Sequence, residues 1–330
     1  MSLKETVVVI GGAGYIGSHA VKELVKRYNV IVYDNLFRGH RWALQWGEFV
    51  EGDIHDTAKL TALFLKHFVK GVFHFAAHSL VGESVEKPLL YWENNVSGTL
   101  SVLKAMKEAS VNHIVFSSTA AIFGEPEVIP INEDALHQPC NPYGHTKLTV
   151  ENILSQCRAA YGLSYSVLRY FNAAGASPDG EIGEDHSPET HLIPLVLDAA
   201  LGKRKSISIF GDDYDTADGT CVRDYIHVTD LAVAHVLAYE KIRRENSNLA
   251  LNLGNGLGFS VLQVIETVKK VTGIDFPVEM AARRAGDPST LISSSKKAID
   301  SLNWSPLYPE LSDIVSTAWN WHRKHFDTGR

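Results

Sequence analysis

Short β-branched runs alternate with stretches of helical periodicity as far as Arg169. A run at 6–10 precedes a helix that extends through Arg27, and a second run at 30–33 follows it. A strand, a helix and a strand in this order form a βαβ unit, so the pattern predicts parallel neighbouring strands. The alternation continues with strands at 49–50, 71–75, 111–117 and 164–169, and with helices near 57–68, 90–109 and 147–161.

The predicted strands are apolar along their whole length, with no alternation of apolar and polar residues. Such strands are typical of a parallel sheet that helices cover on both faces, because neither face meets water. A chain of 330 residues is also long enough for two lobes around one continuous core. We therefore predict an α/β fold, namely a Rossmann-type doubly wound parallel sheet with a smaller mixed α/β lobe at the C-terminus.

The alternating pattern breaks after Arg169, which indicates the second lobe. An acidic loop with Gly and Pro spans 177–188, a helix begins near His191, and a second loop, rich in Asp and Gly, spans 211–219. A strand at 250–253, a helix that Ser260 caps and a helix from about 310 to 324 follow.

The overall charge and the N-terminal segment limit the possible partners. A net charge of −7 and the lack of a long basic run argue against a nucleic-acid partner. Between Lys4-Glu5 and the first glycines stand only five apolar-leaning residues, too few for a signal peptide or a membrane span. We therefore expect a cytoplasmic protein with neither a nucleic-acid nor a membrane partner.

Cysteine and histidine usage bears on disulfides and metals. Cys140, Cys157 and Cys221 are odd in number, widely spaced and outside any C-x-x-C pattern, which is typical of reduced thiols in a cytosol. The closest histidine pair with ligand spacing, His74 and His78, lacks a nearby set of Cys or carboxylate ligands. We therefore expect no metal ion.

A glycine-rich turn joins the first strand to the first helix. Residues 12–17 fit G-x-G-x-x-G, and Gly11, Gly14 and Gly17 form an overlapping repeat. These glycines let backbone amides approach a pyrophosphate at a helix N-terminus, where the helix dipole also favours an anion. The motif predicts a dinucleotide site, and a simple tight turn is the alternative.

Two acidic residues extend this site. Asp34 ends the second strand at the distance expected of a carboxylate that hydrogen-bonds an adenosine ribose. A carboxylate there repels a 2′-phosphate, which favours NAD over NADP. Asp53, after the third strand, is placed to flank the adenine. The alternatives are a loop-capping role for Asp34 and a plain turn at Asp53.

Tyr143 and Lys147 stand four residues apart, so the phenol and the ammonium share one face at the start of a helix. The strand before them ends at Thr119, at the sheet edge where doubly wound folds bind ligands. The set predicts removal of a hydroxyl proton by Tyr143 coupled to hydride transfer to nicotinamide, with Thr119 on the proton path. A plain amphipathic helix start is the alternative.

A tyrosine needs help to act as a base, because its usual pKa is about 10. An ammonium about 4 Å away, at an effective dielectric constant of about 20, supplies about 4 kcal/mol, or roughly 3 pKa units. We therefore expect Lys147, together with a cationic nicotinamide ring, to bring the pKa of Tyr143 near 7.

At these residues the chain resembles the extended short-chain dehydrogenase/reductase family, and within it the 4-epimerases of UDP-sugars. The likeness covers nearly the whole chain, and its segments together are highly specific. They are residues 11–19, 34–36, 75–77, 81–84, 94–96, 117–119, 141–143, 170–172, 218–220 and 222–227.

The resemblance implies a reaction and a division of labour. NAD stays bound while Tyr143 removes the C4 hydroxyl proton of UDP-galactose or UDP-glucose. A 4-keto sugar forms, rotates and takes the hydride back on its other face. Residues 1–172 would bind NAD, with later segments, about 220–260, returning to that domain. Residues 173–330 would mainly hold the nucleotide sugar.

The resemblance also implies a homodimer through the helices at 90–109 and 147–161, and it assigns the contacts. Two arginines suit a diphosphate, although either arginine is also explained by a surface ion pair. The catalytic set is Tyr143, Lys147 and Thr119. The cofactor set is Gly11, Gly14, Tyr15, Ile16, Gly17, Asp34, Asn35, Asp53, Ile54, Phe75, Ala76, Ala77, Asn95, Ser117, Tyr143, Lys147 and Tyr170. The substrate set is Thr119, Tyr143, Asn172, His191, Leu192, Phe210, Arg223, Arg284 and Asp287.

Some positions depart from the family pattern and leave alternatives open. Ser79 and His191 stand where some members carry lysine and asparagine, and Leu291 aligns with a site whose size decides whether N-acetyl sugars enter. A 4-epimerase of UDP-N-acetylglucosamine or UDP-glucuronate, and a non-catalytic NAD-sensing protein, therefore remain alternatives. A 4,6-dehydratase is disfavoured, because alanines rather than an acid follow Thr119.

Overall fold

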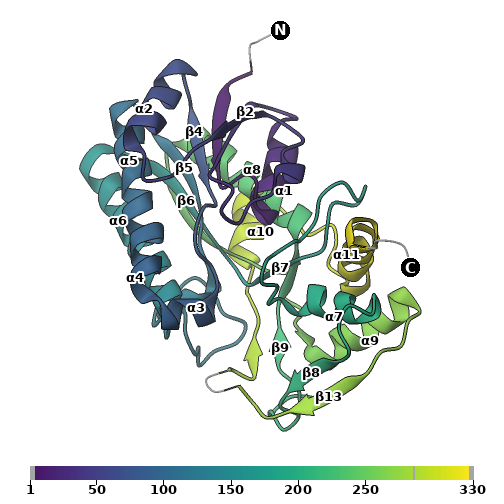
Figure 1. The fold of residues 1–330 in the computed structure, drawn as a ribbon. Helices are drawn as coiled ribbons and strands as arrows, with labels where there is room; N and C mark the ends of the chain where they lie inside the picture. The colour runs from purple at the N-terminus through teal and green to yellow at the C-terminus, as the bar shows by residue number, and fades with distance from the viewer. Residues whose placement is uncertain (1–3, 285–286, 327–330) are drawn as a thin grey trace.

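A seven-stranded sheet lies at the centre of the computed structural model, which describes residues 4–284 and 287–326 (Figure 1). All of its neighbouring strands are parallel, which confirms the predicted Rossmann-type α/β fold. In spatial order the strands are β11 (Asn248–Leu253), β6 (Ser164–Tyr170), β5 (His113–Ser117), β4 (Gly71–His74), β1 (Thr6–Ile10), β2 (Asn29–Asp34) and β3 (Glu48–Glu51).

Helices cover both faces of this sheet (Figure 1). One face carries α1 (Tyr15–Leu24) and α8 (Val228–Glu245), and the other carries α2 (Thr57–Lys66), α5 (Gly98–Glu108) and α6 (Pro142–Tyr161). Both halves of the chain therefore cover the sheet, since α8 comes from the C-terminal half.

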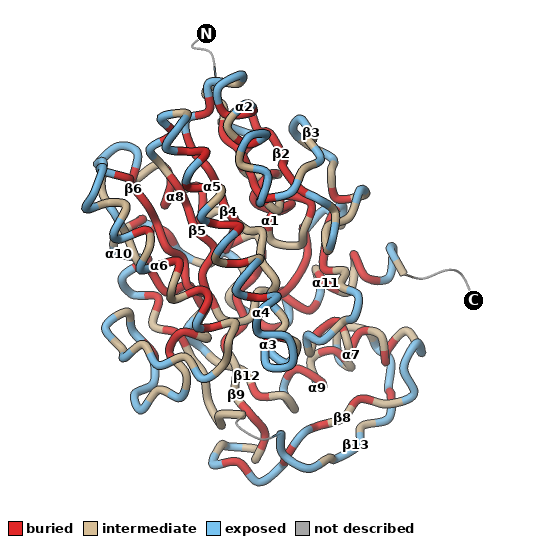
Figure 2. The backbone as a smooth tube through the Cα atoms, turned by 60° about the vertical axis from the view of Figure 1, so that its left-hand side comes forward, coloured by how far each residue is buried: buried red, intermediate tan, exposed pale blue. Residues whose placement is uncertain are grey.

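Successive residues of the central strands point into two separate cores. In β1, Val7 and Val9 pack with α1 and α8, whereas Val8 and Ile10 pack with α2, α5 and α6. Because side chains alternate between two covered faces, successive positions of such a strand are apolar. Figure 2 shows the central strands buried along most of their length.

The segment predicted as one helix at 90–109 is three consecutive pieces. A short α4 (Pro88–Tyr91) leads into a π-helical turn, η2 (Trp92–Ser97), and then into α5. Asn95, in the π turn, donates to the His78 carbonyl at 3.0 Å and accepts from the His78 backbone N–H at 2.8 Å. The wider turn aims this buried amide at the loop after β4, and periodicity alone does not reveal it.

Two helix boundaries also differ from the sequence prediction. α6 begins at Pro142 rather than at Lys147, because the Asn141 side chain accepts a hydrogen bond from the Gly144 N–H at 2.9 Å and caps the helix. α1 ends at Leu24 rather than at Arg27.

The second lobe is built from three helices and short strand pairs. Its core joins apolar residues of α7 (Leu192–Ala200), α9 (Val261–Thr272) and α11 (Leu311–Phe326). Ser260 caps α9, as predicted.

The strands of the second lobe form small separate sheets. They are β7 (Asn172–Ala174) with β10 (Tyr225–His227), β8 (Ile207–Phe210) with β13 (Val278–Ala281), and β9 (Val222–Arg223) between β12 (Phe259–Ser260) and β14 (Thr290–Leu291). The remaining short elements are η1 (Arg41–Ala43), α3 (Val81–Glu86), η3 (Ala120–Ile122) and α10 (Lys296–Leu302).

A buried ion pair fastens α6 to the sheet. Arg169 on β6 donates to Glu151 on α6 through Nη2 at 2.6 Å and through Nε at 3.2 Å. Ser118, just after β5, donates to the same carboxylate at 2.5 Å. The side chains of Arg169 and Glu151 are only 5% and 7% exposed. Each charge therefore depends on the other, since water reaches neither.

We predict that Arg169→Met lowers the free energy of unfolding by about 3 kcal/mol or more, because it leaves the Glu151 carboxylate buried and unpaired. Urea denaturation followed by circular dichroism measures the loss. The matched control is Arg41→Met, which breaks an exposed pair with Glu51 and should cost less than about 1 kcal/mol. Equal small losses in both variants would contradict the role of the buried pair.

Candidate active site

The glycine-rich turn after β1 is packed too closely for side chains. A Cβ at Gly17 would lie 2.1 Å from the Gly11 carbonyl oxygen, and a Cβ at Gly11 would lie 2.5 Å from the Ala76 nitrogen. Gly14 precedes α1, and no side chain in the described part of the protein caps that helix. The first N–H groups of α1 are thus available to an anion. The turn fits the pyrophosphate of a dinucleotide.

Asp34, at the end of β2, is buried and holds this turn in place. Its Oδ2 accepts the Ala13 N–H at 3.0 Å, and its Oδ1 accepts the Leu36 N–H at 2.8 Å. The loop-capping role is thus real, but each carboxylate oxygen keeps a second lone pair for a ribose hydroxyl. Burial raises the pKa of Asp34, while these backbone hydrogen bonds lower it in part.

The other predicted cofactor residues lie at the same end of the sheet. Asn35, after β2, donates to the Asp53 carboxylate at 2.8 Å. Asn95 donates to the Thr146 hydroxyl at 3.1 Å and so links the loop after β4 to α6. Phe75, Ala76 and Ala77 directly follow β4, and the Ala76 N–H donates to the Ile10 carbonyl at 3.1 Å.

The predicted catalytic side chains meet where β5 ends and α6 begins. The Lys147 ammonium donates to the Ser117 carbonyl at 2.7 Å and lies 5.9 Å from the centre of the Tyr143 ring. Tyr143 also forms a hydrogen bond with the side chain of Thr119. The Ser117 hydroxyl bonds the Tyr170 phenol. The structure therefore brings these five residues of the predicted set together.

Burial governs the acid–base character of this group. It lowers the pKa of Lys147 to about 7, although the nearby Glu151 carboxylate raises it in part. It also raises the pKa of Tyr143, and the hydrogen bond with Thr119 offsets only part of that rise. The protein groups alone therefore do not bring the Tyr143 pKa near 7. The reason is that the Lys147 ammonium bonds a backbone carbonyl, and its own charge is weakened by burial.

Glu151 is a residue that the sequence prediction missed. It stands four positions after Lys147 on α6, so both side chains lie on the same helix face. That spacing is the signal that points to it. Glu151 supports the charge of Lys147 while it is held by Arg169 on β6.

In the second lobe, part of the predicted substrate set forms one group. The Arg223 guanidinium pairs with the Asp287 carboxylate, and the Asp287 N–H donates to the Arg284 carbonyl at 3.3 Å. The Arg284 guanidinium stacks 4.0 Å from the centre of the Phe210 ring. An ion pair is thus present, but it joins Arg223 to Asp287 and not to Asp224, the next residue in the sequence.

The other predicted substrate residues have contacts of their own. Asn172, on β7, donates to the Asp224 carbonyl at 2.9 Å. Leu192 begins α7, and His191 is its N-cap residue. The His191 imidazole faces the Glu184 carboxylate, with Nδ1 2.8 Å from Oε1. This contact was not anticipated from the sequence.

Comparison with known proteins settles the family. Residues 7–254 match the model of the NAD dependent epimerase/dehydratase family. The chain belongs to this family. The match begins in β1 and ends just after β11, so it includes every strand of the seven-stranded sheet.

Full-length relatives from this epimerase/dehydratase family are similar over almost all of the chain. The UDP-glucose 4-epimerase of Halalkalibacterium halodurans is 57% identical, over 97% of this chain and 96% of its own. A crystal structure of a UDP-glucose 4-epimerase is 50% identical with a TM-score of 0.96, over 99% of both chains. The Brucella ovis UDP-glucose 4-epimerase in complex with NAD is 49% identical with a TM-score of 0.94, over 98% of both chains.

We predict that Gly17→Ala lowers the affinity for NAD at least about tenfold, because the new Cβ pushes the Gly11 backbone out of the turn that approaches the pyrophosphate. Calorimetric titration of NAD into the cofactor-stripped protein measures the affinity. The control is Gly82→Ala on α3, where none of the described residues comes within 4 Å of the new Cβ. Wild-type affinity in Gly17→Ala would rule out this turn as the pyrophosphate site.

Proposed function

We propose that the chain interconverts UDP-galactose and UDP-glucose by NAD-dependent epimerisation at C4. The observation that carries this proposal is the group of Tyr143, Lys147 and Thr119, which lies at the same edge of the parallel sheet as the glycine turn before α1. The high identity to UDP-glucose 4-epimerases over the whole chain supports the choice of UDP-hexoses.

Each catalytic side chain has a defined task in this proposal. The glycine turn and Asp34 would hold NAD, which would supply the hydride acceptor and donor for C4. Tyr143 takes the C4 hydroxyl proton and gives one back, and Thr119 hydrogen-bonds the same oxygen. A charged Lys147, 5.9 Å from the centre of the Tyr143 ring, would favour the phenolate form once substrate and cofactor are in place. That help depends on the Lys147 charge, which is present below about pH 7 and is lost above it.

Substrate binding falls to the second lobe in this proposal. Arg223 and Arg284 supply two guanidinium groups for the diphosphate, and Phe210, which Arg284 already stacks on, offers an aromatic face to the nucleotide. We assign NAD binding to residues 1–172 with about 220–260, since α8 and β11 belong to the sheet layer, and the nucleotide sugar mainly to 173–330.

Epimerisation of N-acetylated UDP-sugars stays an alternative to epimerisation of UDP-hexoses, because of the position and size of Leu291. Leu291, on β14, pairs in register with Arg223 on β9. It also packs against the same small apolar cluster as Ala120, the residue that follows Thr119. Leu291 therefore belongs to the region that joins the proposed diphosphate group to the loop of the catalytic hydroxyl. A medium-sized residue there does not by itself exclude a larger sugar.

We predict that the purified chain converts UDP-galactose into UDP-glucose with no added cofactor, because NAD returns to its starting state in each cycle and stays bound. Proton NMR of the anomeric signals follows the conversion, and parallel samples with UDP-N-acetylglucosamine and UDP-glucuronate define the substrate range. If UDP-galactose and UDP-glucose are not interconverted even after NAD is supplied, the proposed substrate is wrong.

Two tyrosine variants of α6 serve as the matched pair for this assay. Tyr143→Phe removes the proposed base and should slow turnover by about 10³-fold while NAD stays bound. Tyr161→Phe removes a phenol from the exposed end of the same helix and should leave turnover unchanged. Similar turnover rates in both variants would contradict the role of Tyr143 as the base.

We further propose a homodimer in the cytoplasm. Large apolar side chains are exposed on the helices next to the predicted contact, with Leu89 on α4 81% exposed and Leu100 on α5 37% exposed. Exposed apolar residues that gather on one face are typical of an interface. None of the helices in the described part of the chain combines the length and apolar character needed to cross a membrane.

We predict that Leu89→Glu combined with Leu100→Glu converts the dimer into a monomer, because two carboxylates would be buried in the contact. Sedimentation velocity measures the mass. Leu136→Glu, at a residue that is 70% exposed in the loop before α6, is the control and should stay dimeric. A wild-type chain that sediments as a monomer at micromolar concentration would contradict the dimer.

A further inference from the structure

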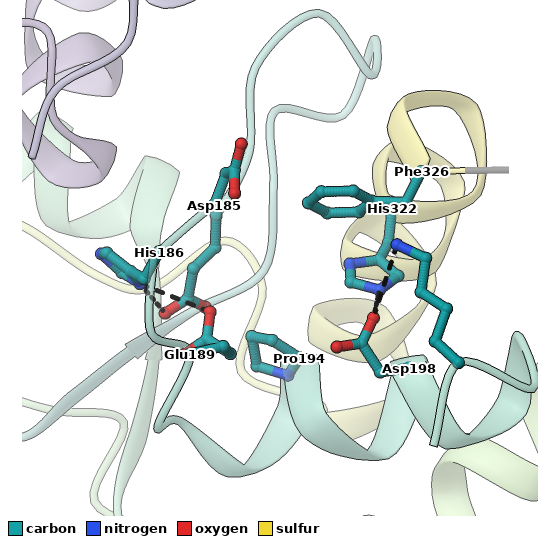
Figure 3. Close-up of a pocket in the computed structure, with 9 residues that line it drawn as sticks. Asp185, His186, Glu189, Pro194, Asp198, His322 and Phe326 are labelled. Carbon is teal, nitrogen blue, oxygen red and sulfur yellow. Dashed lines mark hydrogen bonds and ion pairs between the residues drawn. The ribbon is translucent and has the colours of Figure 1, made fainter. Parts of the chain in front are cut away.

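Four side chains of the loop before α7 converge on one point. They are Glu184, His186, Glu189 and His191, in the spacing E-x-H-x-x-E-x-H, and each offers one ligand atom within 4.8 Å of all the others. Figure 3 shows His186 and Glu189 together on this loop, across a cavity of about 90 Å³ from Asp198 and His322. The expectation that no metal binds rested on other histidines and did not weigh this segment.

Three of the four distances in this cluster match those between ligands of one metal ion, and the fourth is shorter. The His191 Nδ1 lies 2.8 Å from the Glu184 Oε1 and 3.3 Å from the Glu189 Oε1. The His186 Nδ1 lies 3.4 Å from one oxygen of each carboxylate. Tetrahedral zinc with bonds of about 2.0–2.2 Å holds its ligand atoms about 3.3–3.6 Å apart.

Two polar atoms inside the cluster lack well-formed hydrogen bonds. Glu184 is only 6% exposed, and no donor among the described residues reaches its Oε1 with hydrogen-bond geometry, although the His191 Nδ1 lies 2.8 Å away. The His186 Nδ1 lacks such a partner too. Buried polar atoms nearly always have a partner, so a carboxylate oxygen that faces two imidazole nitrogens without well-formed hydrogen bonds points to a missing cation.

We propose that Glu184, His186, Glu189 and His191 bind a divalent cation of the zinc class. Two imidazoles and two carboxylates are a donor set that zinc prefers, and the two carboxylates neutralise its charge. Four protein ligands complete a tetrahedral shell, so the ion has a structural role and takes no part in the sugar chemistry. His191, predicted as a substrate contact, becomes a metal ligand.

The surroundings of the cluster already orient its ligands. The Glu189 Oε1 accepts the backbone N–H groups of Thr190 at 2.7 Å and His191 at 2.8 Å. Such contacts fix the direction of a ligating carboxylate before the ion arrives. His191 is also the N-cap residue of α7. The ion therefore ties the loop to the first turn of that helix.

The loop that carries the cluster also contacts the N-terminal part of the chain. Arg38 donates to the Ser187 carbonyl at 2.5 Å, and the His40 Nε2 lies 2.9 Å from the Asp185 carbonyl oxygen. The Tyr15 ring, at the start of α1, packs edge-on against His186 with 6.1 Å between ring centres. A cation here would hold the segment that joins the second lobe to the glycine turn.

A network of charged histidines and carboxylates is the competing explanation. Although burial opposes charge on the imidazoles, contact with Glu184 and Glu189 raises the pKa of His186 to about 9 and that of His191 to about 10. Without an ion, the cluster would thus carry two protons and satisfy its own charge. Zinc would displace both protons, and the two explanations differ in whether the chain holds metal.

The first test uses the wild-type chain. Purified without chelator, or loaded with Zn²⁺ and desalted, it should hold about one zinc per chain by elemental mass spectrometry. Replacement by Co²⁺ should give the intense visible absorption of a tetrahedral site. A strong chelator should lower the Tm by about 5 °C, and added Zn²⁺ should restore it. Less than about 0.1 zinc per chain after loading would overturn the proposal.

The second test locates the ion. His186→Gln combined with His191→Gln should abolish stoichiometric zinc and the cobalt absorption. The matched control is Asp185→Asn, which removes a carboxylate from the same loop but not from the cluster, and it should keep the metal. Equal zinc in the double variant would place the ion elsewhere and overturn the assignment. Metal content is measured without substrate, so this result is independent of the proposed epimerase activity.

Discussion

The buried contact between Glu151 on α6 and Arg169 on β6 is the constraint on which the site depends. It fixes the register of α6 against the end of the sheet, and the same helix carries Tyr143 in its first turn and Lys147 in its second. The reacting groups are therefore held by an ionic contact one or two turns away, in a place that water does not reach. Their geometry is set by folding and is in place before a ligand arrives.

Burial has opposite effects on the two central groups, and this difference matters chemically. It raises the pKa of Tyr143 and lowers that of Lys147, so the isolated protein favours a neutral phenol beside an amine that is only partly charged. Both shifts mean that charge in this pocket is costly. A positively charged ligand ring next to the phenol would change that balance, which makes the proton transfer dependent on occupancy of the cofactor site.

Much of the fold could be predicted from local patterns, because both faces of the sheet are covered and its central strands are mostly apolar on both faces. The glycine turn and the four-residue spacing of Tyr143 and Lys147 are equally local signals. The missed features depend on tertiary contacts. The π turn at Asn95 exists because its amide bonds the backbone of His78, and the pairing of Glu151 with Arg169 joins residues that no periodicity connects. The contact of His191 with Glu184 could not be predicted either, since the two residues meet only in the folded loop.

The position of β11 has a consequence for how the chain is made. This strand, residues 248–253, pairs with β6, residues 164–170, and so closes one end of the sheet. During synthesis the ribosome must add roughly eighty residues after β6 before its partner exists, which at ordinary elongation rates takes several seconds. For that time an apolar strand edge is open to solvent and to other nascent chains. Chaperone demand should therefore be concentrated in the interval between these two strands.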